Sequence, residues 1–163
     1  MGQDHFFDIV SRVDLQEVAN AANVALKEIR NRFDFKNSRV DILLEKDKLT
    51  LLADDDFKLR NLKLAFEEKL VKRKVSLKAL NYGRVEDAAG RTVRQVATFQ
   101  AGIPIEKARE IIKLIKGERF KAQTAIQGDE VRISSAKIDT LQEIIAFLRS
   151  KDLGIHMQFT NYR

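Results

Sequence analysis

The order strand, helix, strand, strand, helix, strand occurs twice along the 163 residues, once in each half of the chain. In each half, two segments carry apolar residues at helical spacing, and the segments around them are rich in β-branched residues. This order is typical of a ferredoxin-like unit, in which an antiparallel sheet carries both helices on one face. We therefore predict an α+β fold of two tandem ferredoxin-like (βαββαβ) sandwiches rather than one enzyme core.

The boundaries of the predicted elements follow from periodicity and turn residues. In the first half they are a strand at 6–10, a helix at 14–34, strands at 40–44 and 49–53, a helix ending near Lys74, and an extended segment at 75–85. In the second half they are a strand at 91–100, a helix beginning after Pro104, strands at 121–127 and 130–134, a helix at 138–148, and a strand at 155–160.

The turn between the two halves determines how the strands pair. Residues 86–90 form a short turn, so the segments 75–85 and 91–100 should pair as a hairpin. This pairing fills the first-strand position of the first sheet, and the N-terminal strand, residues 6–13, must then complete the other sheet beside 155–160. We predict exchanged first strands and two domains, one of residues 14–101 and one of residues 1–13 with 102–163.

The composition offers little material for catalysis. There is no Cys, and His5 and His156 lie at opposite ends of the chain, so thiolate or His-based metal sites and a Ser–His–acid triad lack support. The three Asp residues at 54–56 fit helix capping better than a magnesium cluster, and no Gly-rich phosphate loop occurs. We predict that the protein is not an enzyme and has no catalytic residue, metal or cofactor.

The charge of the chain favours anionic partners. Lys and Arg number 30 against 24 acidic residues, for a formal charge of +6 and a pI near 9.6. Such a balance suits RNA, DNA or nucleotides, although a plain solvated surface explains it equally well. No apolar run reaches about 18 residues and no signal segment is recognisable, so we expect a soluble, cytoplasmic protein with no membrane partner, as a monomer or weak dimer.

Two clusters of basic residues are candidate ligand sites. The first ends the second helix, where the helix dipole also favours cations, so a purely structural role is an equal alternative. In the third helix, Arg109, Lys113 and Lys116 share one solvent face, which can follow a phosphate backbone or serve only as a solvated face. The predicted binding residues are Lys72, Arg73, Lys74, Arg109, Lys113, Lys116, Lys121 and Arg132.

The open face of the second sheet is predicted to be polar. If Ile126 and Ile133 point inward, this face carries Gln123, Ala125, Gln127, Glu130, Arg132 and Ser134. Phe6 and Asp8 join it if Phe7 and Ile9 point towards the helices. A face nearly without aromatic residues argues against the usual base stacking on RNA-recognition sheets, and it allows hydrogen bonds to a nucleotide or packing against the other domain.

The chain resembles the YajQ family of small bacterial proteins over nearly its whole length. The resemblance includes Phe7-Asp8-Ile9-Val10-Ser11, the ending Gln158-Phe159-Thr160-Asn161-Tyr162-Arg163, and residues 13–18, 32–36, 70–73, 77–80, 113–116, 126–128, 131–132, 139 and 141–142. It implies tandem ferredoxin-like domains that exchange their N-terminal strands, and nucleotide binding with RNA or cyclic dinucleotides as ligands.

Charge and resemblance together predict a nucleotide-binding protein whose Lys and Arg residues hold phosphates. The predicted ligand is RNA, of a tRNA-like kind, or a mononucleotide. The alternative is a cyclic di-GMP effector that acts through a protein or DNA partner. The two hypotheses differ in that RNA binding should weaken steeply with salt, whereas an effector should bind one ligand saturably and change its domain packing.

Overall fold

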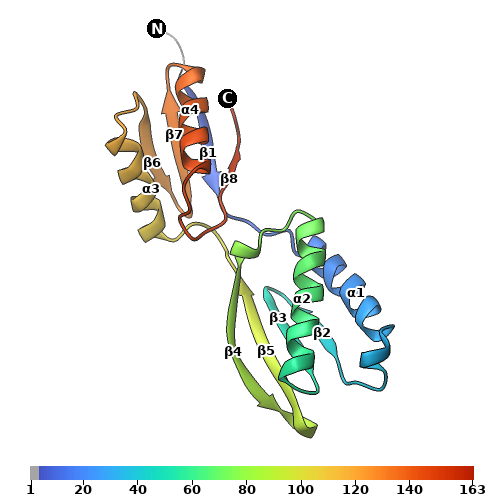
Figure 1. Cartoon of the computed structure of the whole chain (residues 1–163). Coiled ribbons are helices and arrows are strands. Elements are labelled where there is room, and N and C mark those ends of the chain that lie inside the picture. Colours follow the sequence, from blue (N-terminus) through green and yellow to red (C-terminus); the bar gives the residue numbers. More distant parts are fainter. Residues whose placement is uncertain (1–3) are drawn as a thin grey trace. The chain divides into compact units, whose positions relative to one another are not determined.

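The computed structural model describes residues 4–163, which form two compact units (Figure 1). One unit, here called the middle unit, is Val13–Phe99, and the other, the terminal unit, combines residues 4–12 with Gln100–Arg163. Each unit contains one four-stranded antiparallel sheet and two of the chain's α-helices. The fold is therefore α+β. None of the helices between residues 4 and 163 combines the length and the apolar composition needed to cross a membrane.

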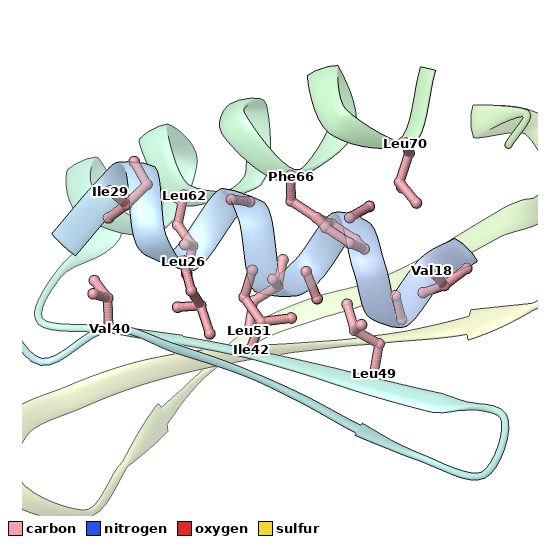
Figure 2. Close-up of a cluster of buried hydrophobic side chains, with 14 of the residues drawn as sticks. Val18, Leu26, Ile29, Val40, Ile42, Leu49, Leu51, Leu62, Phe66 and Leu70 are labelled. Carbon is pink, nitrogen blue, oxygen red and sulfur yellow. The ribbon is translucent and has the colours of Figure 1, made fainter. Parts of the chain in front are cut away.

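The middle unit packs both of its helices against one face of its sheet. Its elements are α1 (Leu15–Arg30), β2 (Asp41–Glu45), β3 (Lys48–Ala53), α2 (Asp56–Lys72), β4 (Leu80–Ala88) and β5 (Thr92–Phe99), and the strand order is β2-β3-β5-β4. In Figure 2, side chains of both helices, such as Leu26 and Phe66, meet those of Ile42 and Leu51 on the strands. This burial of apolar surface is the main stabilising term of the unit.

Acidic residues begin both helices of the middle unit. The Asp14 carboxylate accepts hydrogen bonds from the backbone N–H groups of Gln16 and Glu17 at 3.0 and 3.3 Å. Asp55 accepts one from the N–H of Lys58 at 2.8 Å. These bonds satisfy donors that have no partner within the helix.

The terminal unit repeats this architecture with segments from both ends of the chain. Its elements are β1 (His5–Val10), α3 (Ile105–Gly117), β6 (Gln123–Gln127), β7 (Glu130–Ser135), α4 (Ile138–Arg149) and β8 (Gln158–Thr160), in the strand order β6-β7-β1-β8. Phe7 and Ile133 on the strands and Ile111 and Ile144 on the helices are fully buried in one core.

The first strand of the chain lies in the sheet of the terminal unit. Within β1, Phe7 pairs with Ile133 of β7, and Ile9 pairs with Phe159 of β8. In the middle unit the corresponding position, between β3 and β4, is occupied by β5. The pairing of β1 is thus the exchange that the short turn between the two halves predicts.

The helix predicted at 14–34 is too long. α1 ends at Arg30, and a separate 3-10 turn, Phe33–Phe35, follows it. The backbone leaves the helix because Phe35 folds back into the core, where only 3% of its surface stays exposed. Periodicity could not show this break, since Phe33 continues the helical spacing of apolar residues.

Other predicted boundaries also shift. Within 75–85, Leu77–Ala79 forms a 3-10 turn capped by Ser76, and β4 then continues to Ala88. The connecting turn is therefore not 86–90 but the shorter Ala89–Arg91, where Gly90 has a φ of 70°. The last strand, predicted at 155–160, begins only at Gln158, because Ile155 is anchored in the core beside Leu153 instead of entering the sheet.

Candidate functional site

The basic residues that end α2 are largely neutralised by acidic neighbours. Lys72 Nζ lies 3.4 Å from a carboxylate oxygen of Glu68, and Arg73 Nη1 donates to Glu17 Oε2 at 3.2 Å. Lys74 has a φ of 63° and follows the helix end. The pair between Arg73 and Glu17 joins α2 to α1. A structural role accounts for Lys72 and Arg73, although sequence spacing could not distinguish it from a ligand site.

Three basic residues on α3 have a different environment. Arg109, Lys113 and Lys116 are all exposed, while the opposite face of the helix buries Ala108, Ile111 and Ile115. Among residues 4–163, no carboxylate lies within ion-pairing distance of these three cations. We call them the α3 ridge.

Neighbouring charges leave the α3 ridge unneutralised. The nearby Lys107 is the cation that takes an acidic partner, since its Nζ lies 3.3 Å from Glu110. Lys121 follows the helix with an exposed side chain, and its backbone C=O accepts a hydrogen bond from Ser135 Oγ at 2.9 Å. An exposed face with uncompensated positive charge attracts phosphates, with a strength that depends on salt.

Arg132 lies on the other face of the terminal sheet, within a cluster of interacting side chains. Its Nε and Nη2 donate to the two carboxylate oxygens of Asp8 at 2.8 and 3.1 Å. Asn161 Nδ2 donates to the same carboxylate at 2.9 Å, and the guanidinium carbon of Arg132 lies 4.0 Å from the ring centre of Phe6. We call Phe6, Asp8, Arg132 and Asn161 the Arg132 cluster.

Asp8 and Arg132 each stabilise the charged form of the other. Hydrogen bonds from Arg132 lower the pKa of the Asp8 carboxyl below its ordinary value of 3.8, although burial opposes the shift. The same hydrogen bonds raise the pKa of Arg132. Asp8 therefore stays ionised at neutral pH even though only 1% of its surface is exposed.

The polar character predicted for this sheet face is found in the structure, with one difference. Phe7, Ile9 and Ile133 point into the core, so the alternate residues face away from the helices. Ile126, as the register partner of the buried Val131, lies on the core-facing side as predicted, yet 36% of its surface is exposed. It lies on β6, an edge strand, where no further strand covers it.

A pocket of about 320 Å³ lies in the middle unit. Its lining residues are Asp56, Leu59, Arg60, Lys63, Val85 and Gln95. The Lys63 ammonium lies 3.9 Å from the ring centre of Tyr82, and Gln95 Nε2 donates to the C=O of Gly83 at 2.8 Å. Burial, reinforced by Glu67, raises the pKa of Tyr82, so its hydroxyl remains protonated and donates to Glu67.

A larger depression, of about 530 Å³, follows α1. It is lined by Asn23, Val24, Leu26, Lys27, Arg30 and Asn31. Arg30 is occupied there, because it donates to the C=O of Val40 at 2.9 Å and lies 3.7 Å from Asp41. The depression is therefore a weaker candidate site for an anionic ligand than the pocket beside Lys63.

Two residues of the run of three Asp, Asp54 and Asp55, have structural roles. Asp55 caps α2, and Asp54 accepts a hydrogen bond from the N–H of Arg39 and pairs with Lys58. Within the described part of the chain, no group of three or more His, Cys, Asp or Glu side chains has an arrangement that could hold a metal ion.

Comparison with known proteins places the chain in a family. The family model described as nucleotide-binding protein YajQ-like matches residues 5–163. The chain belongs to the YajQ-like family. A relative from Koribacter versatilis is 56% identical over 160 residues, 98% of each chain. Relatives from Desulfitobacterium hafniense and Bacillus cytotoxicus are 55% and 52% identical over 163 residues, the whole of both chains. All three are named nucleotide-binding proteins.

The YajQ-like fold separates the predicted binding residues into distinct surfaces. Lys72, Arg73 and Lys74 belong to the middle unit, whereas the α3 ridge and Arg132 occupy opposite sides of the terminal sheet. Sequence reasoning missed Arg60, Lys63 and Gln95. The pocket that they line lies beside an irregularity in the β4–β5 pairing between Tyr82 and Val85. The only sequence signal for such an irregularity is Gly83, and an isolated Gly is weak support.

Proposed function

We propose that this YajQ-like protein binds the phosphate groups of RNA and that the α3 ridge is the contact surface. The names of its relatives support a nucleotide ligand. The observation that carries the choice of surface is the lack of acidic partners for Arg109, Lys113 and Lys116 in the described residues. Lys72 and Arg73 at the end of α2, by contrast, are engaged by Glu68 and Glu17.

The geometry of the α3 ridge suits several consecutive phosphates. From Arg109 to Lys116 the helix advances about 10 Å, at about 1.5 Å per residue. Each phosphate that a Lys or Arg neutralises releases bound counterions, and this release favours binding without reading the sequence. Such a surface fits a structured RNA of the tRNA-like kind, which presents a continuous backbone.

We further propose that binding, without catalysis, is the function, and that it takes place in the cytoplasm. The described groups whose pKa values are shifted are engaged with one another: Asp8 binds Arg132, Glu28 binds Lys69, Asp34 binds Arg32, and Glu67 accepts a hydrogen bond from the neutral Tyr82. We also infer that both units are ferredoxin-like. Their orders β8-β1-β7-β6 and β4-β5-β3-β2 place equivalent strands in equivalent positions, with two helices on one face.

A mononucleotide is the second candidate ligand, because the middle unit contains a pocket of suitable size. Its volume of about 320 Å³ is at the lower end of the range for small-ligand sites. Arg60 and Lys63 offer positive charge for a phosphate, and Leu59 and Val85 offer apolar surface for a base. A cyclic dinucleotide such as cyclic di-GMP, acting through a protein or DNA partner, is the third candidate.

The test is a titration of a labelled, structured RNA such as a tRNA at two salt concentrations with the variant Lys113→Glu/Lys116→Glu. The matched control is Lys72→Glu/Lys74→Glu, which changes the net charge equally at the other basic cluster. We expect the ridge variant to lose at least about tenfold in affinity, since it loses two phosphate contacts. The control should lose much less. Equal losses in both variants would show that only net charge matters, and full binding by the ridge variant would refute the proposal.

Mononucleotides and cyclic di-GMP are titrated into the same proteins. If GMP or AMP binds and Arg60→Glu abolishes this binding while the ridge variant retains it, the pocket in the middle unit is the nucleotide site. Saturable binding of cyclic di-GMP, with no binding of RNA, would favour the effector alternative.

A further inference from the structure

The Arg132 cluster holds an arginine side chain in one fixed orientation on an open sheet face. Two of the five N–H groups of the guanidinium are used by Asp8, through Nε and Nη2. Asp8 is itself held by Asn161, and Phe6 lies beneath the guanidinium at 4.0 Å. These contacts restrain both an edge and one face of the planar guanidinium of Arg132.

The buried carboxylate is an unusual choice for this face. Asp8 has only 2% of its side chain exposed, and burying a carboxylate carries a large desolvation cost that its partner only offsets. An apolar residue at this position would avoid that cost. What Asp8 provides in return is a defined orientation of Arg132, which an exposed arginine otherwise lacks.

The outer side of Arg132 remains accessible. A third of its side chain, 33%, is exposed. The residue that pairs with Arg132 on the neighbouring strand β6 is Ala125, whose methyl group is too short to cover a guanidinium. The remaining N–H donors and the face opposite Phe6 are therefore free to meet a ligand.

The charges around Arg132 favour an uncharged planar ligand over a phosphate. Asp8 neutralises Arg132, and Glu130, on the same strand, forms an ion pair with Arg12. The local net charge of these four residues is therefore zero, unlike that of the α3 ridge. Nucleobases stack on arginine planes as they do on aromatic rings, and they accept hydrogen bonds from the edge of the guanidinium.

We propose that the Arg132 cluster is a stacking platform for a single nucleobase, with the base lying on the guanidinium face opposite Phe6. The inference deepens the proposed function in naming what part of a nucleic acid is recognised, and it uses a different face of the terminal unit from the α3 ridge. Arg132 is thus a base-binding residue, and Asp8, Phe6 and Asn161 are positioning residues.

The experiment compares two probes with the same number of phosphates, a six-nucleotide RNA and its abasic analogue. With the natural protein, the RNA should bind about tenfold or more tightly than the abasic probe, as is usual for one stacked base. Arg132→Lys keeps the charge but removes the plane, and should abolish this ratio. Arg94→Lys is the matched control, because Arg94 also pairs with a carboxylate, Glu86, across a sheet of the other unit. It should leave the ratio unchanged.

A second variant tests whether the fixed orientation of Arg132 is needed to bind the base. Asp8→Asn frees Arg132 from its fixed orientation and adds one positive charge, so the abasic probe should bind more tightly while the RNA-to-abasic ratio falls. Circular dichroism and thermal unfolding verify that each variant is folded. A ratio that survives in both Arg132→Lys and Asp8→Asn would overturn the proposal.

Base stacking on the Arg132 cluster can be tested separately from RNA binding by the α3 ridge. An uncharged nucleoside, guanosine or adenosine, is titrated into ¹⁵N-labelled protein, and the Nε–H resonance of Arg132 is followed. A saturable shift supports the platform even if the variant Lys113→Glu/Lys116→Glu shows no defect. If neither nucleoside moves this resonance although RNA binds through the α3 ridge, the platform is wrong and the proposed function stands.

Discussion

Arg132 and Asp8 form a two-pronged ion pair although they stand 124 positions apart in the chain. The pair bridges β7 and β1 on the open face of the terminal sheet, where the two residues are register partners. Phe7 and Ile133 are the adjacent register partners on the opposite face of the same strands. The N-terminal strand is therefore anchored in the terminal unit by both an apolar and an ionic contact.

Removing the apolar anchor should unfold one unit selectively. Phe7→Ala leaves a cavity in the terminal core and should cost about 3 to 5 kcal/mol of unfolding free energy, the usual range for a buried Phe. In hydrogen–deuterium exchange, α3 and α4 should lose protection while α1 and α2 keep theirs. The matched variant is Phe66→Ala, since Phe66 is equally buried in the middle unit. It should show the reverse pattern, and loss of protection in all four helices of Phe7→Ala would contradict the assignment of β1 to one unit.

The ionic anchor predicts a dependence of stability on pH. The pKa of Asp8 is lowered from 3.8 in the folded protein because Arg132 hydrogen-bonds to it. The contribution of Asp8 to stability is therefore present above about pH 4 and is lost as the pH falls through the lower, folded-state pKa. Urea unfolding should show a large difference between the natural protein and Asp8→Asn at pH 7, and this difference should shrink as the pH is lowered further below 4.

The control for that measurement is Asp47→Asn, at an exposed residue of the β2–β3 turn without an ion pair among residues 4–163. Its difference from the natural protein should stay nearly constant over the same pH range. A constant difference for Asp8→Asn as well would contradict the role of Arg132 in holding the carboxylate ionised.

A glycine before α3 should resist substitution. Gly102 has a φ of 79°, and an added Cβ would lie 2.6 Å from Asp129 Cγ. Its N–H donates to the C=O of Ser11 at 2.8 Å, so the backbone cannot easily move away. Gly102→Ala should lower the unfolding free energy by at least about 2 kcal/mol. Gly117→Ala, where nothing lies within 4 Å of the added Cβ, should be neutral or slightly stabilising in the same thermal or urea unfolding experiment.

Salt dependence reports the number of phosphates that the α3 ridge contacts. Neutralising one cation with Lys113→Gln should reduce the slope of log affinity against log salt by about 0.7, the value for one contact with a single strand. The same substitution at Lys72, which is paired with Glu68, should change the slope much less. An unchanged slope for Lys113→Gln would remove Lys113 from the interface.

Local patterns predicted most of the fold. Alternation in β7 placed Ile133 inward and Arg132 outward, and the short turn after β4 predicted where β1 would pair. The errors arise where a distant contact overrides a local preference. α1 stops early because Phe35 turns into the core, and β8 starts late because Ile155 is held beside Leu153. Neither contact leaves a trace in the spacing of nearby residues.

The candidate sites were harder to predict than the fold. Helical spacing identified Arg109, Lys113 and Lys116 as neighbours, but whether a cation is neutralised depends on which carboxylate the fold brings near it. Arg73 meets Glu17 from another helix, and Arg132 meets Asp8 from the other end of the chain. The pairing of charges is a property of tertiary structure, so sequence alone gave all of these cations equal weight.

The exchange of β1 also sets an order of events during translation. A ribosome releases the N-terminal strand first, yet its partners β7 and β8 are made last. The middle unit has all of its strands once Phe99 has emerged, whereas the N–H and C=O groups of β1 have no partner strand until Val131 and Ile133 are made. For that interval the nascent chain carries an open β-strand, which a chaperone or a neighbouring chain on the same message can capture.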